Sequence, residues 1–213
     1  MNEELYNEIS TYLQKGNVGK VKELVSQAAE SGLDPEEILT KGMLPGMNII
    51  GEKFKNNEVF VPEVLIAARA MKAGSDILKP YLMKAGVEAK GTVVIGTVKG
   101  DLHDIGKNLV KMMMEGKGLN VVDLGVDVSA ERFVQTALDN NAQIICCSAL
   151  LTTTMGEMGN VTALVKEKGL KGKIYVMVGG APVTQKFCDE IGADAYTQDA
   201  ASAADKAMEL LAG

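Results

Sequence analysis

The sequence predicts an α + α/β fold, in which an N-terminal antiparallel helical bundle precedes a doubly wound, five-stranded parallel domain of the Rossmann-like or flavodoxin-like kind. The first observation is that apolar residues in the N-terminal part recur with helical periodicity, without a strand pattern. The second is that short apolar runs and amphipathic helical stretches alternate through the rest of the chain. We therefore predict two domains, 1–85 and 91–213, joined by a glycine-containing linker at 86–90.

The N-terminal part contains four or five predicted helices separated by glycine, proline or polar residues. These breaks fall at 16–17, 31–32, 45–46 and 55–58. Asp34 followed by Pro35 is typical of a helix N-cap and its first helical position. The run Val61-Pro62-Glu63 opens a long final helix. Helices of this length with short connections predict a small antiparallel bundle.

The C-terminal part contains five predicted strands, each followed by a predicted helix. The strands are 92–97, 120–124, 143–148, 173–178 and 194–197, and the helices are 105–115, 130–140, 156–168, 184–191 and 200–211. Short, continuously apolar strands that alternate with helices predict a parallel sheet covered on both faces. Ligands of such domains bind beyond the carboxyl ends of the strands, so the loops that follow the strands are the candidate site.

The composition excludes several classes of partner. A net charge of -6 argues against nucleic acid, because phosphate binding needs a basic face. We expect no membrane partner, because the apolar runs are too short to span a bilayer, and the polar, acidic N-terminus is unlike a signal peptide. We therefore expect a cytoplasmic protein. The three cysteines lack zinc-site spacing and are expected to be structural thiols.

His103, the one histidine of the chain, follows the first predicted strand and lies two residues after Asp101. A lone histidine is usually structural, but a glycine-flanked strand-to-helix turn favours a ligand. The stretch lacks the dinucleotide fingerprint and the P-loop, and the chain has no nucleophile elbow. Catalytic zinc needs three protein ligands. One imidazole beside a carboxylate instead suits one axial position on a metal whose other ligands come from a macrocycle.

Three motifs stand in order in the predicted loops. They are Asp101-x-His103-x-x-Gly106, Ser148-x-Leu150 and Gly179-Gly180. Together they resemble the pattern of cobalamin-binding domains that hold the cofactor base-off and His-on. The stretches 46–54 and 60–65 resemble the helical cap of methyl-carrying members. Nearly the whole chain therefore resembles a corrinoid protein of a three-component methyltransferase system, and is similar to the cap and cobalamin-binding modules of methionine synthase.

The resemblance implies roles for particular residues. His103 would coordinate cobalt, Asp101 would accept a hydrogen bond from its other ring nitrogen, and Thr154 would replace a serine that extends this chain in methionine synthase. Whether a threonine completes the relay stays open at this point. The remaining cofactor-binding candidates are loop residues Asp104, Ile105, Gly106, Ser148, Leu150, Thr152, Gly179 and Gly180, and cap residues Met47, Val61 and Leu65. Ordinary loop capping, helix capping by Asp104 and bundle packing of the cap residues are the alternatives.

The resemblance also implies a function. Cobalamin, as a Co(I) corrinoid and as methylcobalamin, would carry a methyl group from a substrate-specific methyltransferase to a second methyltransferase. The acceptor would be tetrahydrofolate or coenzyme M, and a reductive activase would be a further partner. Whether such a component counts as an enzyme is open, because it depends on its partners. A mutase subunit and a cobalamin-sensing module are the alternatives. The sequence names neither the methyl donor nor the oligomeric state.

Overall fold

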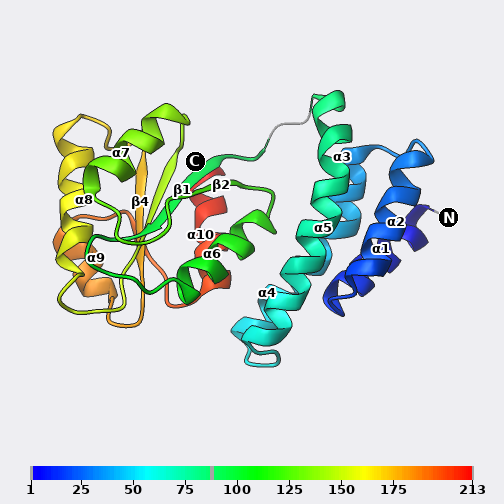
Figure 1. The fold of residues 1–213 in the computed structure, drawn as a ribbon, viewed down its shortest axis with the longest axis horizontal. Coiled ribbons are helices and arrows are strands. Elements are labelled where there is room, and N and C mark those ends of the chain that lie inside the picture. The colour runs from blue at the N-terminus through cyan, green and yellow to red at the C-terminus, as the bar shows by residue number, and fades with distance from the viewer. Residues whose placement is uncertain (1, 87–88, 213) are drawn as a thin grey trace. The chain divides into compact units, whose positions relative to one another are not determined.

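The structure is a computed structural model that describes residues 2–86 and 89–212 (Figure 1). The chain forms two compact units, one built mainly from residues up to Ala89 and the other mainly from Lys90 onward. The predicted linker at 86–90 includes Val87 and Glu88, which lie outside the described residues, so the linker remains a prediction. Within the described ranges, each helix is too short or too polar to cross a membrane.

The first unit is helical throughout. Its elements are α1 (Asn2–Gln14), α2 (Val18–Glu30), α3 (Pro35–Glu37), the π-helix η1 (Ile38–Met43), α4 (Leu44–Lys55) and α5 (Val61–Ala85). Asn17 caps α2 by accepting from the backbone N–H of Lys20 at 3.0 Å. Asp34 caps α3, as predicted, by accepting from the N–H of Glu36 at 2.9 Å. The apolar stripes are buried, which confirms the helical bundle.

The predicted break at Pro45-Gly46 is wrong, because helical winding continues from α3 through η1 into α4. Pro45 lies in the first turn of α4, where a missing N–H is tolerated. The turn before it is π-wound, and Leu44 N–H donates to Leu39 O. A Cβ on Gly46 would lie 2.9 Å from Ser10 O, so this glycine permits close packing of α1 against α4.

The second unit is a parallel sheet with helices on both faces. Its strands are β1 (Thr92–Thr97), β2 (Asn120–Asp123), β3 (Ile144–Ser148), β4 (Tyr175–Gly179) and β5 (Ala195–Tyr196), in the order β2-β1-β3-β4-β5. Its helices are α6 (Ile105–Glu115), α7 (Ala130–Asp139), α8 (Gly156–Glu167), α9 (Gln185–Ile191) and α10 (Ala200–Ala212). Figure 1 shows α7, α8 and α9 on one face, and α6 and α10 on the other. This strand order is the flavodoxin-like one, so the predicted doubly wound domain is confirmed.

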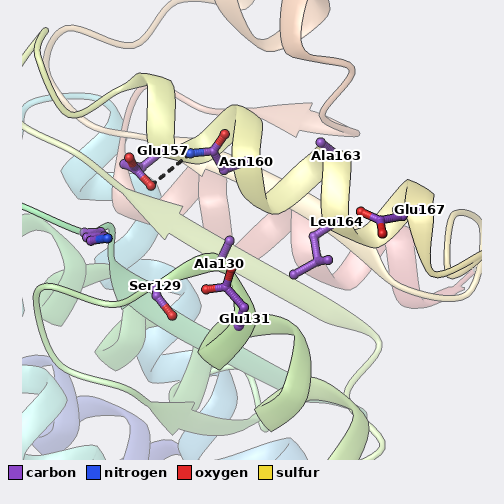
Figure 2. A pocket seen from close by; sticks show the side chains of 9 residues that line it. Ser129, Ala130, Glu131, Glu157, Asn160, Ala163, Leu164 and Glu167 are labelled. Carbon is purple, nitrogen blue, oxygen red and sulfur yellow. Dashed lines mark hydrogen bonds between the residues drawn. The ribbon is translucent and has the colours of Figure 1, made fainter.

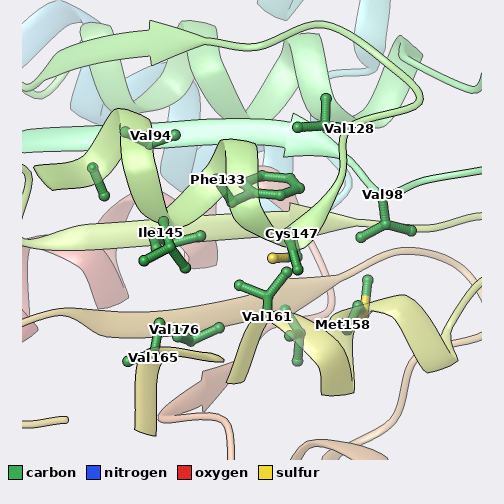
Figure 3. Close-up of a cluster of buried hydrophobic side chains, with 14 of the residues drawn as sticks. Val94, Val98, Val128, Phe133, Ile145, Cys147, Met158, Val161, Val165 and Val176 are labelled. Carbon is green, nitrogen blue, oxygen red and sulfur yellow. The ribbon is translucent and has the colours of Figure 1, made fainter. Parts of the chain in front are cut away.

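An apolar core fills the space between the sheet and helices α7 and α8 (Figure 3). Phe133 packs over β1 because Gly96 makes room for it; a Cβ on Gly96 would lie 2.8 Å from the ring. Cys146 and Cys147 are buried in β3, and Cys188 is buried in α9. Burial raises the pKa of Cys146 to about 12 and that of Cys147 well above its usual value. All three are free thiols, and the two in β3 are poor nucleophiles.

The strand register aligns three loops at the carboxyl edge of the sheet. Thr97 at the end of β1 pairs with Ser148 at the end of β3, and Ser148 pairs with Gly179 at the end of β4. The connection from β1 leads to α6 on one face, and the connection from β3 leads to α8 on the other. Ligands of open α/β sheets bind at such a switch point. The predicted motifs therefore lie where the fold offers a site.

Candidate functional site

Asp101, in the loop after β1, is a fully buried carboxylate that joins two loops. Its Oδ1 accepts from the backbone N–H of His103 at 3.1 Å and lies 2.7 Å from His103 Nδ1. Its Oδ2 accepts from Leu150 N–H at 2.8 Å, Leu151 N–H at 3.2 Å and Thr154 Oγ1 at 2.8 Å. One side chain therefore holds both the histidine and the loop after β3.

These hydrogen bonds determine the charge of Asp101. Burial alone would raise the pKa of its carboxyl group, because a charge is poorly solvated in the interior. Hydrogen bonds donated by Leu150, His103 and Thr154 outweigh that effect and hold the pKa of Asp101 well below its usual value. An ionised carboxylate only accepts hydrogen bonds, so the proton lies on His103 Nδ1. In the neutral imidazole, Nε2 then carries a free lone pair, which is what a metal ligand requires.

The imidazole lies at the surface of this unit, on a loop that also carries exposed apolar side chains. The His103 side chain is 51% exposed. Four apolar side chains of the same two loops are also exposed: Leu102, Ile105, Leu150 and Leu151. Exposed large apolar side chains around one polar group are typical of a surface that a ligand or partner covers. This arrangement fits a broad, flat ligand with a metal at its centre.

The glycines of the motifs differ in whether the fold itself requires a glycine at that position. Gly180 has φ +135°, and a Cβ there would lie 1.9 Å from Ala149 O, so the fold itself requires glycine. Gly106 has an ordinary φ, and a Cβ there would meet no described atom within 4 Å. Gly179 is similarly open, with Thr197 O at 3.7 Å as its nearest neighbour. Packing of the described chain explains neither Gly106 nor Gly179, whereas a ligand tail lying against the backbone would explain both.

The other predicted residues occupy mixed positions. Ser148 is half-buried at the end of β3, and Thr152 is exposed in the following loop. Asp104 is exposed, and its carboxylate accepts from the Asn108 side-chain amide at 3.0 Å, so it stabilises the first turn of α6. In the helical unit, Met47 is buried, and Val61 and Leu65 are half-buried. The cofactor-binding roles of all these residues remain predictions.

Two residues that hold Asp101 and its loop were not predicted. Leu151 donates its N–H to Asp101, although its side chain carries no polar group. Asp127 accepts from Gly100 N–H at 2.7 Å and donates its own N–H to Asp101 O at 3.0 Å. Asp127 has φ 54°, a conformation that aspartate tolerates better than most residues. The position of Asp127 after β2 was the one feature of the sequence that could have predicted its role, and the loop after β2 contains no recognised motif.

A separate polar cavity of about 360 Å³ lies between α7 and α8 (Figure 2). Its lining includes Lys99, Glu131, Glu157 and Glu167, and none of the predicted site residues. Among the described residues there is no group of three or more His, Cys, Asp or Glu side chains that could hold a metal ion. The donor set that the structure does show, one imidazole beside a carboxylate, fits a metal whose other ligands come from a macrocycle.

Comparisons with known proteins agree with this geometry. A B12 binding domain model matches residues 91–207, more than half of the chain, and a second B12 binding domain model matches residues 5–79. The chain belongs to the B12-binding corrinoid proteins.

Relatives of this B12-binding protein match most of its length. It is 45% identical over 213 residues to dimethylamine corrinoid protein 2 of Methanosarcina acetivorans, covering 99% of this chain and 98% of that protein. It is 44% identical over 191 residues to trimethylamine corrinoid protein 1 of Methanosarcina mazei, covering 89% of this chain and 88% of that protein.

A solved structure supports the same fold for this B12-binding protein. The methanol:cobalamin methyltransferase complex MtaBC of Methanosarcina barkeri contains a chain that matches with a TM-score of 0.89 and 33% identity, over 100% of this chain and 81% of that one. The predicted family, fold class and cobalamin cofactor are therefore confirmed.

Proposed function

We propose that this B12-binding protein is a methyl carrier of the cytoplasm, which takes a methyl group from one methyltransferase and delivers it to another. The observation that carries this proposal is the hydrogen-bonded pair of Asp101 and His103, which leaves Nε2 available at the switch point of the sheet. Bound cobalamin would supply the cobalt on which the methyl group travels. A helical region that matches its own B12 binding domain model favours a methyl carrier over a mutase subunit.

The residues of the chain would position the cofactor and leave the chemistry to it. His103 would hold cobalt through Nε2, Asp101 would fix the ring orientation, and Thr154 would hold Asp101. The nucleotide tail would lie along a set of residues that includes the two open glycines. They are Asp104, Ile105, Gly106, Ser148, Leu150, Thr152, Gly179 and Gly180. Met47, Val61 and Leu65 of the helical unit would be further cofactor-binding residues.

The partners follow from this role. The first is a substrate-specific methyltransferase, of the kind that the MtaBC complex pairs with a corrinoid protein. The second is a methyltransferase that passes the group to tetrahydrofolate or coenzyme M, and a reductive activase restores the carrier after oxidation. Relatives named for dimethylamine and for trimethylamine are almost equally similar, at 45% and 44% identity. A methylamine is therefore the first donor to test.

The test is methyl transfer to the reduced, cobalamin-loaded protein. The loaded protein is mixed with its cognate methyltransferase and, in separate reactions, with mono-, di- or trimethylamine or methanol. We expect the absorbance change of cobalt methylation with one donor class, and none when His103→Ala replaces the wild type at equal cobalamin content. A loaded protein that accepts no methyl group from any of the four donors would contradict the carrier function.

A further inference from the structure

The main chain of His103 is held as firmly as its side chain. The N–H of His103 donates to Asp101 Oδ1 at 3.1 Å, and Nδ1 is bonded to the same oxygen at 2.7 Å. The His103 carbonyl oxygen accepts from Thr97 Oγ1 at 2.8 Å. Of the four hydrogen-bonding groups of this residue, Nε2 is the one without a partner in the described part of the chain. The three restraints together leave little freedom in where Nε2 lies.

Thr97 differs from Asp101 in where it is anchored. Asp101 belongs to the same loop as His103, and its side chain is held by another loop, the one after β3. Thr97 is the last residue of β1 and is fully buried. Its N–H donates to Gly125 O at 2.9 Å, and its carbonyl accepts from Val128 N–H at 3.0 Å. The Thr97 hydroxyl is therefore a donor fixed to the sheet, and it ties the histidine loop to the rigid part of the fold.

We infer that Thr97 is a positioning residue for the cobalt ligand, an inference that rests on the proposed function. Its hydroxyl fixes the carbonyl group of His103, and with it the position of the imidazole that would coordinate cobalt. Without this hydroxyl, the Asp101 contact still orients the ring, but the peptide that carries the ring is free to rotate away from the strand. The expected consequence is a shift of bound cobalamin from the His-on to the His-off state, with cobalamin still bound through its tail.

A purely structural role is the competing explanation, since any buried hydroxyl that donates to a carbonyl adds stability. Thr162 in α8 provides a matched control within the same unit. It is 7% exposed, and its Oγ1 lies within hydrogen-bonding distance of two carbonyl oxygens, Gly159 O at 2.9 Å and Ile191 O at 2.8 Å. Thr162→Val removes an equivalent hydroxyl that has no hydrogen bond to the histidine loop.

The experiment compares the wild type with Thr97→Val, Thr97→Ser and Thr162→Val, all as full chains loaded with cobalamin. The ratio of His-on to His-off cofactor is measured from the absorbance spectrum, and from the axial nitrogen splitting of the Co(II) state by electron paramagnetic resonance. Unfolding in urea reports stability separately. Thr97→Ala serves as a second hydroxyl-free variant if the valine variant does not fold.

We expect Thr97→Val to lower the His-on to His-off ratio by roughly two- to tenfold, as the loss of one hydrogen bond implies. Thr97→Ser should restore the ratio, and Thr162→Val should lose stability with the ratio unchanged. A wild-type ratio in both hydroxyl-free variants, or an equal shift in Thr162→Val, would overturn the inference. A wild type that binds cobalamin without nitrogen splitting would refute the proposed ligand itself, and the role of Thr97 with it.

Discussion

The Gly106→Ala variant is expected to be more stable than the wild type and to bind cobalamin more weakly. Gly106 is the second residue of α6, its φ is ordinary, and a Cβ there meets no described atom within 4 Å. Replacing glycine by alanine in a helix stabilises it by up to about 0.5–1 kcal/mol. If the open space holds the cofactor tail, the added methyl group overpacks it at a cost of roughly 1–3 kcal/mol, or about 5- to 150-fold in affinity.

Gly19→Ala provides the control for this prediction. Gly19 is likewise the second residue of a helix, α2, and its nearest neighbour is Asn17 Oδ1 at 3.7 Å. Thermal unfolding of the cobalamin-free proteins should show a similar small gain for both variants. Equilibrium titration with hydroxocobalamin should show weaker binding for Gly106→Ala alone. Wild-type affinity in Gly106→Ala, or equal weakening in Gly19→Ala, would refute the assignment of this space to the ligand.

Three further predictions concern Asp101, Thr154 and Gly180. The pKa of Asp101 is depressed in the folded state, so its contribution to stability is present above pH ~4 and is lost as the pH falls below that value. The free energy of urea unfolding should therefore fall more steeply from pH 6 to pH 3 in the wild type than in Asp101→Asn. Thr154→Val removes a 2.8 Å hydrogen bond to Asp101 and should lower the free energy of urea unfolding by about 1.5–3 kcal/mol. Thr154→Ser keeps the hydroxyl and should lower it much less, so equal losses in the two variants would contradict the role of the hydroxyl. Gly180→Ala should lower the free energy of unfolding by roughly 3 kcal/mol or more, because the added Cβ would overlap Ala149 O. Near-native stability of this variant would contradict the described loop.

Most of the fold could be predicted because its signals are local. Apolar runs with their own periods identify each strand and helix of the second unit, and the alternation of the two leaves few topologies. The flavodoxin-like order could not be told from the Rossmann order, since strand order depends on crossovers that composition does not report. The error at Pro45-Gly46 has the same origin. A proline followed by a glycine normally ends a helix, but here Gly46 serves the contact with Ser10, which lies far away in sequence.

The contacts of the candidate site likewise fall into those that the sequence implied and those that depend on the fold. Asp101 and His103 are two residues apart, and the resemblance to cobalamin-binding domains implied the contact that the structure has at 2.7 Å. The bonds from Leu151 and Thr97 depend on loop conformation and on the alignment of β1 with β3, which no residue type signals. The relay from Thr154, left open by the sequence, has hydrogen-bonding geometry because its hydroxyl lies on the loop that Asp101 also holds. The sequence therefore offers candidate ligand-binding residues more readily than the residues that support them.

The most direct test of His103 as the cobalt ligand uses the fact that the chain contains one histidine. Protein without added histidines is labelled with ¹⁵N-histidine, loaded with cobalamin and reduced to the Co(II) state for electron paramagnetic resonance. If His103 binds cobalt through Nε2, the axial nitrogen splitting changes from the triplet of ¹⁴N to the doublet of ¹⁵N, and it is absent in His103→Ala. A triplet that persists in the labelled protein, or in His103→Ala, would show that the axial nitrogen comes from the cofactor and would contradict the proposed site.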